Sequence, residues 1–167
     1  MKLLIHDLTE KEFKKIFQTV PRDVMILSPS QNIHPCIGCF SCWVRTPSYC
    51  IIKDDYQLMS DVFSKISELI IVSKCCYGSY SPYVKNVIDR SLPYLLPFLE
   101  IRNGEMRHHP RYDNRFFVSA HFYGDMITPE EERIAASFVA ENSKNFLCLG
   151  HEVYFHREKS ALKGIAL

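Results

Sequence analysis

The chain has 167 residues, with 20 Lys and Arg against 19 Asp and Glu, so its formal net charge is +1. This balance gives no electrostatic attraction to nucleic acid or to an anionic membrane, and both partner classes are therefore without support. Seven cysteines are too few for a disulfide scaffold, and the N-terminal apolar run is too short for a signal peptide. We expect a cytoplasmic protein with a single domain over residues 1–167.

The hydrophobic pattern alternates between strands and helices along the chain. Short apolar runs predict five buried strands, at residues 3–5, 24–27, 69–72, 116–118 and within 147–155. Apolar residues at helical spacing predict four helices between them, at residues 13–20, 59–66, 84–91 and 134–139. Parallel strands need crossover connections that carry helices, so this order predicts a doubly wound α/β domain with helices on both faces of a parallel sheet.

Local signals mark where several of these helices begin. Thr9 with Glu12 three residues later predicts a capping box, and Asp54 predicts an N-cap for the helix that follows it. The Ser81-Pro82 pair predicts another helix start, because proline suits the first helical position.

Two stretches lack a regular period, a cysteine-rich loop at residues 34–53 and an aromatic, basic insertion at residues 93–114. The insertion contains Arg107, His108, His109 and Arg111, a group that would attract the phosphate of a pyridine dinucleotide or simply form a solvated face. The solvated face is the simpler interpretation.

Four cysteines of the loop have the spacing C-x2-C-x2-C-x7-C, at positions Cys36, Cys39, Cys42 and Cys50. Thiols at three-residue steps can converge on one centre, and closely spaced thiolates suit iron–sulfur clusters or zinc. The same spacing also fits free thiols that are buried or redox-active. The alternatives are thus a 4Fe-4S cluster, a zinc ion or free thiols. We expect this loop to lie at the carboxyl end of the second strand.

Two segments of the sequence carry a resemblance to a known family. The first reads CIGCFSCW from Cys36 and CIIKDD from Cys50, and the second reads GSYSPYVKNVIDR from Gly78. Together they resemble the flavodoxin-like NAD(P)H-dependent FMN reductases and the related iron-sulfur flavoproteins. The resemblance implies a five-stranded flavodoxin-like sheet of order 2-1-3-4-5, FMN as redox centre, NAD(P)H as electron donor, a small-molecule electron acceptor and a homo-oligomer, often a homodimer.

The resemblance also implies a cofactor-binding loop after the third strand, along the edge of the flavin ring. This loop contributes Ser73, Cys75, Cys76, Tyr77, Gly78, Ser79 and Tyr80. A flavin needs flat apolar contacts and a few backbone amides, and a glycine between two tyrosines offers both. Lys74 stands where the family usually has proline, and Cys76 where it usually has an aromatic residue.

The first loop departs from the family, whose glycine-containing cradle binds the FMN phosphate at a helix N-terminus. Residues 6–12 contain no glycine and place Asp7, Glu10 and Glu12 at that helix end, where they repel a dianion. A capping box would also engage the first amides of the helix. If FMN binds, we expect loose binding, with the phosphate on the amides of residues 8–11 and on the Thr9 hydroxyl, and the three carboxylates turned into solvent.

Three functions remain open from the sequence. The first is an FMN-dependent oxidoreductase that passes electrons from NAD(P)H to a small acceptor. The second is an iron–sulfur electron-transfer or redox-sensing protein whose centre is the four-cysteine loop. The third is a flavodoxin-like domain that has lost flavin binding and serves as a binding or structural partner.

Overall fold

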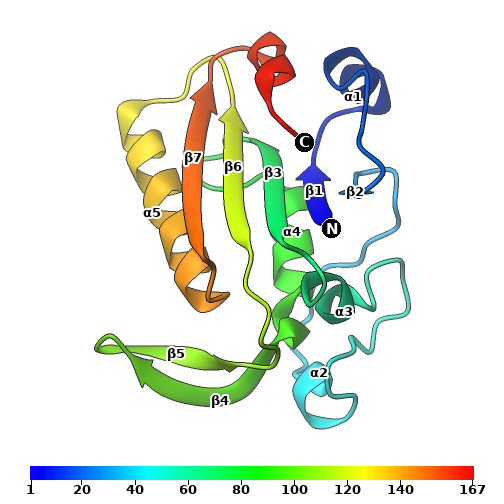
Figure 1. Ribbon diagram of the computed structural model, residues 1–167, viewed down its shortest axis with the longest axis vertical. Helices are drawn as coiled ribbons and strands as arrows, with labels where there is room; N and C mark the ends of the chain where they lie inside the picture. Colours follow the sequence, from blue (N-terminus) through cyan, green and yellow to red (C-terminus); the bar gives the residue numbers. More distant parts are fainter.

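The computed structural model describes residues 1–167 and contains a main sheet of five strands in the order β2-β1-β3-β6-β7 (Figure 1). All four neighbouring pairs in this sheet are parallel. The strands are β1 (Lys2–His6), β2 (Val24–Leu27), β3 (Glu68–Lys74), β6 (Phe117–Tyr123) and β7 (Gly150–His156). Numbered within the sheet, the order is 2-1-3-4-5, so the prediction of a flavodoxin-like α/β fold is confirmed.

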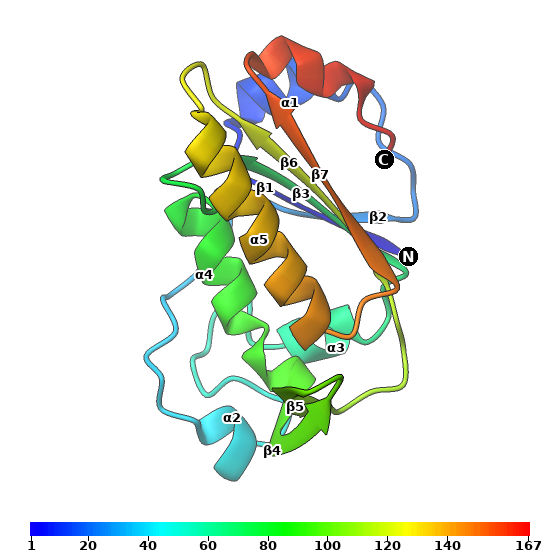
Figure 2. The same cartoon turned by 90° about the vertical axis from the view of Figure 1, so that its left-hand side faces the viewer.

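Helices cover the two faces of the sheet to different extents (Figure 2). One face carries α3 (Met59–Phe63), α4 (Pro82–Arg90) and α5 (Pro129–Asn145). The other face carries α1 (Glu10–Ile16) and the 3-10 helix η2 (Lys159–Gly164), both near the carboxyl ends of the strands (Figure 1). The remaining helices are α2 (Ser41–Val44) and η1 (Leu92–Tyr94). No helix has both the length and the apolar character needed to cross a membrane.

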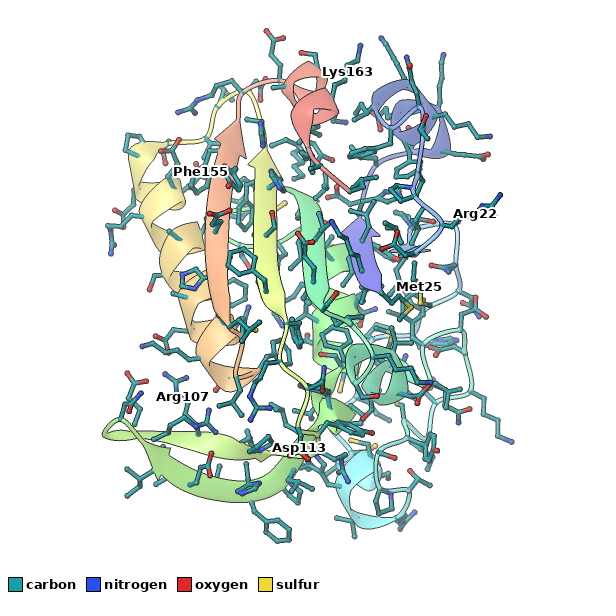
Figure 3. The ribbon with its side chains drawn as sticks, in the orientation of Figure 1. Arg22, Met25, Arg107, Asp113, Phe155 and Lys163 are labelled. Atoms are coloured by element: carbon teal, nitrogen blue, oxygen red, sulfur yellow. The ribbon has the colours of Figure 1, made fainter.

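The larger of two hydrophobic clusters fills the space between the sheet and α3, α4 and α5. It contains 22 buried residues, among them the packed rings of Phe63, Tyr94, Phe116 and Phe146. Phe155, labelled in Figure 3, packs against this cluster from β7. Burial of such a side chain contributes roughly 1.5–3 kcal/mol, so this layer supplies most of the stabilisation of the fold. A smaller cluster of 8 buried residues lies under α1 and η2.

The insertion at residues 93–114 forms an antiparallel hairpin outside the main sheet. Its strands are β4 (Leu95–Arg102) and β5 (Glu105–Pro110), and they lie near the amino ends of the main strands (Figure 1). Asn103 and Gly104 form the turn, with φ angles of 52° and 81°. An Asn-Gly pair favours this left-handed turn strongly, so this is the signal from which the hairpin could have been predicted.

Two predicted helix boundaries are wrong. Asp54 does not cap a helix, because α3 starts at Met59 and the Asp54 carboxylate instead accepts two hydrogen bonds from the buried Arg90 guanidinium, at 2.6 and 2.8 Å. A buried charge requires such a partner, and this need outweighs the local capping preference. The first helix also ends at Ile16, four residues before the end of its apolar pattern.

Candidate functional site

At the carboxyl end of the sheet, Asp7 connects three strands. Its Oδ2 accepts a hydrogen bond from the Lys74 backbone amide at 2.8 Å, and its Oδ1 accepts one from the Tyr123 hydroxyl at 2.9 Å. Burial and the Asp7 carboxylate raise the pKa of Tyr123, so this hydroxyl stays protonated and keeps donating. Asp7 therefore holds the ends of β1, β3 and β6 together.

The predicted capping box at the start of α1 is confirmed. The Thr9 amide and hydroxyl both donate to Glu12 Oε2, at 2.9 and 2.7 Å, and the Glu12 amide donates back to the Thr9 hydroxyl at 3.3 Å. Lys159 donates to the other Glu12 oxygen at 2.6 Å. Hydrogen bonds from Lys159 and Thr9 lower the pKa of Glu12 to about 2. Glu12 therefore folds back onto the chain.

These contacts decide whether the residues present suit an FMN phosphate. The capping box uses the Thr9 hydroxyl and the Thr9 amide, two of the groups that a phosphate would need, and α1 has only seven residues. Glu10 pairs with Lys14 at 2.5 Å but still adds a negative charge to the first turn. Carboxylates at a helix N-terminus satisfy the helix dipole themselves and repel further anions. The residues at this end of β1 do not fit a dianionic phosphate.

The loop after β3 is fixed by its own hydrogen bonds. The buried Ser73 hydroxyl accepts from the Ser81 amide at 2.8 Å and donates to the Lys74 carbonyl at 2.9 Å. The turn at Tyr77 and Gly78 has φ angles of 53° and 74°, and a bridge between Cys76 and Ser79 closes it. Ser73 is therefore a structural residue, and the turn presents its side chains from a fixed backbone.

Packing separates the two tyrosines of this loop. Tyr80 is 3% exposed and stacks on Phe122 with 5.4 Å between ring centroids, so it belongs to the core. Tyr77 is 92% exposed and projects from the turn. Gly78 lies so close to α5 that an added Cβ would stand 2.7 Å from Ile134. Of the two aromatic residues predicted to contact a flavin, only Tyr77 is accessible.

The cysteine-rich loop lies at the other end of the molecule from this turn. Helix α2, which carries Cys42, sits beside the β4–β5 hairpin near the amino ends of the main strands (Figures 1 and 2). Trp43 holds it there, since its indole donates to the Leu95 carbonyl at 2.9 Å and packs on His108 at 5.1 Å. The prediction that this loop lies at the carboxyl end of the second strand is wrong. The chain after β2 instead runs along α4, where Arg90 donates to the His34 carbonyl at 2.8 Å.

The four thiols of this loop differ in exposure and in acidity. Cys36 and Cys39 are exposed, Cys42 is buried and Cys50 is half-buried, and all are free. The hydroxyl and the amide of Ser41 hold the pKa of the Cys39 thiol below its ordinary value. Burial and the three neighbouring thiols raise the pKa of Cys42 to about 11. The loop thus combines one accessible, acidic thiol with three further thiols nearby.

A metal centre on these cysteines remains a prediction. In the structure no group of three or more His, Cys, Asp or Glu side chains has an arrangement that would hold a metal ion. A 4Fe-4S cluster needs all its thiolates directed at one core, and zinc needs four ligands in a tetrahedron. The cluster, the zinc ion and the free thiols therefore all stay predictions.

The basic group of the insertion is engaged within the protein. Arg107 pairs with Glu105 and Glu141, each at 2.5 Å, and Arg111 donates to the Pro93 carbonyl at 2.8 Å. These contacts use the cationic groups that would otherwise attract a dinucleotide phosphate. We find no support for a dinucleotide site on this hairpin.

The structure also brings together a polar cluster that the sequence does not indicate. Ser119 Oγ lies 2.9 Å from Nε2 of His121, and Nδ1 of His121 lies 3.1 Å from Nε2 of His156. Tyr154 stacks on His121 at 4.7 Å. Burial and His156 lower the pKa of His121 to about 4, so this imidazole is neutral at pH 7. The cluster depends on the register of β6 against β7, which the sequence pattern does not specify.

The fold and the sheet order define the class of protein, a flavodoxin-like α/β domain. No family model and no curated protein matches the chain. Among solved structures, the azoreductase AzrA matches with a TM-score of 0.55 and 9% identity, over 92% of this chain and 85% of that one. An azoreductase from Bacillus anthracis str. Sterne matches with a TM-score of 0.54 and 10% identity, over the same shares of the two chains. At these identities the similarity is one of fold.

Proposed function

We propose that this flavodoxin-like protein is a thiol-based redox sensor whose reactive group is the Cys39 thiol. The carrying observation is the exposed Cys39 thiol, whose pKa Ser41 holds below its ordinary value and which shares a loop with Cys36, Cys42 and Cys50. A thiolate is the nucleophilic form of cysteine, so a thiol that is both accessible and acidic reacts first with oxidants. The neighbouring thiols allow the oxidised sulfur to be trapped as a disulfide.

Oxidation of the Cys39 thiol by a peroxide requires neither a metal nor a flavin. The Cys39 thiolate attacks one peroxide oxygen, the O–O bond breaks, hydroxide leaves, and the sulfur becomes a sulfenic acid. A second thiol then attacks that sulfur, the S–O bond breaks, and the oxygen departs as water. Two thiols are oxidised to one disulfide, and one peroxide is reduced to two waters. Cys36 is the expected second thiol because it is exposed, whereas Cys42 is buried with a raised pKa.

The carboxyl end of the sheet favours this proposal over flavin chemistry. The capping box engages Thr9, the Asp7 carboxylate joins β1 to β3 and β6, and Tyr80 lies in the core. Each of these groups would have to be released before an FMN phosphate or ring occupied the predicted position. The amino end needs no such rearrangement, since Cys36 and Cys39 already face solvent.

A second candidate is an FMN-dependent oxidoreductase that takes electrons from NAD(P)H and passes them to a small acceptor. The shared fold with two azoreductases and the exposed Tyr77 ring beside Gly78 favour it. Without a phosphate cradle, any FMN would be held loosely.

An absorption spectrum of protein purified without oxygen separates the candidates. Absorption bands at about 375 and about 450 nm indicate flavin, and a broad shoulder at about 400–420 nm indicates an iron–sulfur cluster. The sensor proposal expects neither, together with a disulfide between Cys39 and Cys36 in peptide mass maps after treatment with one equivalent of hydrogen peroxide. Cys39→Ser should abolish that disulfide, while Cys148→Ser should not, because burial raises the pKa of Cys148 to about 12. A copurified flavin, or an unchanged disulfide yield in Cys39→Ser, would overturn the proposal.

A further inference from the structure

Cys36 lines a hollow beside the cysteine-rich loop. The hollow has a volume of about 470 Å³ and lies where α4, α5 and the β4–β5 hairpin meet. Figure 2 shows the last turns of α4 and α5 directed at this hairpin. The lining combines apolar with polar side chains, which include Ile88, Leu95, Phe146, Asp89, His108 and Asn145. Ligand pockets typically have a similar volume and mixture of side chains, so the Cys36 hollow, as we call it, suits a small organic molecule.

His108 brings a proton acceptor to the Cys36 hollow. Its Nδ1 lies 2.9 Å from the Leu96 carbonyl oxygen, which can only accept, so Nδ1 carries the proton of the neutral ring. Nε2 then holds a lone pair, and no group of the chain donates to it. Trp43 packs on the ring at 5.1 Å and fixes its position. Cys36 and Asp89 are the other titratable groups that line the hollow.

A second hollow, of about 520 Å³, adjoins the first, since Cys36 and Asp89 line both. Lys85 also lines it and pairs with Asp89, and both side chains are 43% exposed. Such exposed pairs contribute little to stability, so both charges are available to a ligand. The Asn145 carboxamide oxygen accepts from Arg107 at 3.1 Å, which leaves the Asn145 NH₂ group to donate to a ligand carbonyl. A zwitterionic peptide complements these groups.

We propose that the Cys36 hollow binds a low-molecular-weight thiol of peptide type, which reduces the disulfide of the sensor by attack on the Cys36 sulfur. This inference rests on the proposed function, since it names the reductant of the same thiols. Cys36 lines both hollows and Cys39 lines neither, so a bound thiol reaches Cys36 first. A peroxide is far smaller than either hollow and has no charges for Lys85 and Asp89.

The reduction takes two molecules of the small thiol. His108 Nε2 accepts the proton of the first, its sulfur attacks Cys36, the bond between the Cys36 and Cys39 sulfurs breaks, and Cys39 leaves as a thiolate. An acidic thiol is the better leaving group, and Ser41 keeps the pKa of Cys39 below its ordinary value. The second molecule attacks the sulfur of the first and releases Cys36. Two small thiols become one disulfide, and their two protons pass to Cys36 and Cys39.

The first test is reduction of the peroxide-treated protein by glutathione, stopped with acid and analysed in peptide mass maps. Glutathione should be attached to Cys36 and not to Cys39. The rate should saturate as the glutathione concentration rises, because the thiol binds before it reacts. Glutathione attached to Cys39, or a rate that stays proportional to concentration, would overturn the proposal.

His108→Gln tests the proton acceptor. Only a few per cent of a thiol with a pKa of about 8.5 is thiolate at about pH 7, so the variant should react about 10-fold more slowly there. At about pH 10 glutathione is already a thiolate, and the two rates should become equal, which a purely structural role of His108 would not produce. The matched control His109→Gln changes a ring that bonds the Pro110 carbonyl and should react at the unaltered rate. Equal rates for His108→Gln and the unaltered protein at pH 7 would contradict the proposal.

Binding of S-methylglutathione separates this proposal from the sensor proposal. This probe cannot exchange disulfides, so its binding to the reduced protein does not depend on oxidation of Cys39. We expect a Kd of about 1 mM or tighter, with NMR shifts at the amides of Cys36, Gly38 and Asn145. Lys85→Ala should weaken binding about 3-fold to 10-fold by removing a charge for the ligand carboxylates. The control Lys65→Ala breaks an equivalent exposed pair with Asp61 on α3 and should change nothing.

The two proposals fail in different ways. A disulfide between Cys36 and Cys39 without binding of S-methylglutathione would overturn the ligand of the Cys36 hollow and leave the sensor intact. Binding at the hollow in a protein that forms no such disulfide would support the ligand and contradict the sensor.

Discussion

The two ends of the sheet differ in how their functional groups are used. Ligands of open α/β sheets usually bind at the carboxyl end. There, the side chains of Asp7, Thr9 and Ser73 form hydrogen bonds with neighbouring segments of the same chain. At the amino end, Cys36 and Cys39 face solvent beside a large apolar surface. The difference teaches that the sheet order can be kept while the solvent-exposed thiols lie at the end opposite the usual ligand site.

Different side-chain contacts stabilise the two ends of the sheet. The carboxyl end depends on the Asp7 carboxylate, which joins three strands, and on the close approach of Gly78 to α5. The amino end depends on the fully buried ion pair between Asp54 and Arg90, which fixes the loop before α3 against the end of α4. Substitutions that remove one of these contacts at a time separate the contributions of the two ends to the free energy of unfolding.

The largest effect is expected from Asp54→Ala at the amino end. It leaves the Arg90 guanidinium buried without its carboxylate, which typically costs about 3–5 kcal/mol in the free energy of unfolding. Urea denaturation followed by circular dichroism measures this. The matched control Asp55→Ala removes only an exposed hydrogen bond to the Asn32 amide and should cost about 1 kcal/mol or less. Equal losses in the two variants would show that the buried ion pair does not hold this end.

At the carboxyl end, Gly78→Ala should be the most damaging small substitution. The new Cβ would stand 2.7 Å from Ile134, and the φ of +74° disfavours any side chain. We expect a loss of about 2–4 kcal/mol in the free energy of unfolding. Gly104→Ala has a similar φ of +81° but no atom within 4 Å, so its loss of about 1 kcal/mol isolates the backbone contribution. A loss no larger in Gly78→Ala than in Gly104→Ala would mean that the turn is not pinned to α5.

Acid should weaken the sheet through two buried histidines, His6 and His121. Burial lowers the pKa of each to about 4, against about 6.5 in the unfolded chain. Between these values only the unfolded state binds the proton, so stability is full above about pH 6.5 and falls as the pH drops toward about 4, by about 1–3 kcal/mol for each histidine. Urea midpoints at pH 7 and pH 4.5 measure the loss, which His121→Gln should reduce and the exposed control His151→Gln should not. A pH-independent midpoint in the unaltered protein would contradict the burial of these two groups as neutral side chains.

The smallest effect concerns FMN at the start of α1. Exchanging Glu10 and Glu12 for glutamine removes two negative charges, worth about 0.3–1 kcal/mol each at a helix N-terminus, so FMN should bind about 3-fold to 30-fold more tightly. Fluorescence-quenching titrations at low salt measure this gain, which should shrink at high salt. The control exchanges Glu130 and Glu131 at the equivalent capping box of α5 and should change nothing. Nanomolar binding of FMN by the unaltered protein would show that this end of the sheet is a working phosphate site.

The parts of the fold that sequence predicts are those governed by local patterns. Apolar periodicity gave the five parallel strands, and the three-residue spacing of Thr9 and Glu12 gave the capping box. The position of the cysteine loop depends on contacts between distant residues, such as Trp43 with Leu95 and Arg90 with His34. No spacing rule encodes such pairs, which is why the loop was expected at the wrong end.

In the candidate site, too, local sequence patterns predict some features and tertiary contacts determine the others. Thiol spacing marked the cysteines of the proposed sensor, but their individual exposure and acidity depend on how Ser41 and the chain around α2 pack. The loop after β3 was located correctly at the carboxyl end, yet the burial of Tyr80 against Phe122 follows from tertiary packing alone. The β4–β5 hairpin was not predicted, although Asn103-Gly104 marks its turn.

The most direct test of thiol chemistry at the amino end is the pH dependence of alkylation, residue by residue. Brief treatment with iodoacetamide between pH 6 and pH 10, followed by peptide mass spectrometry, gives the rate at each cysteine. We predict that Cys39 reacts fastest at pH 7 and reaches half its maximal rate at a lower pH than Cys76, whose pKa is raised by burial. Ser41→Ala should move the Cys39 midpoint upward. A Cys39 rate at pH 7 no faster than that of Cys76 would contradict the proposed sensor.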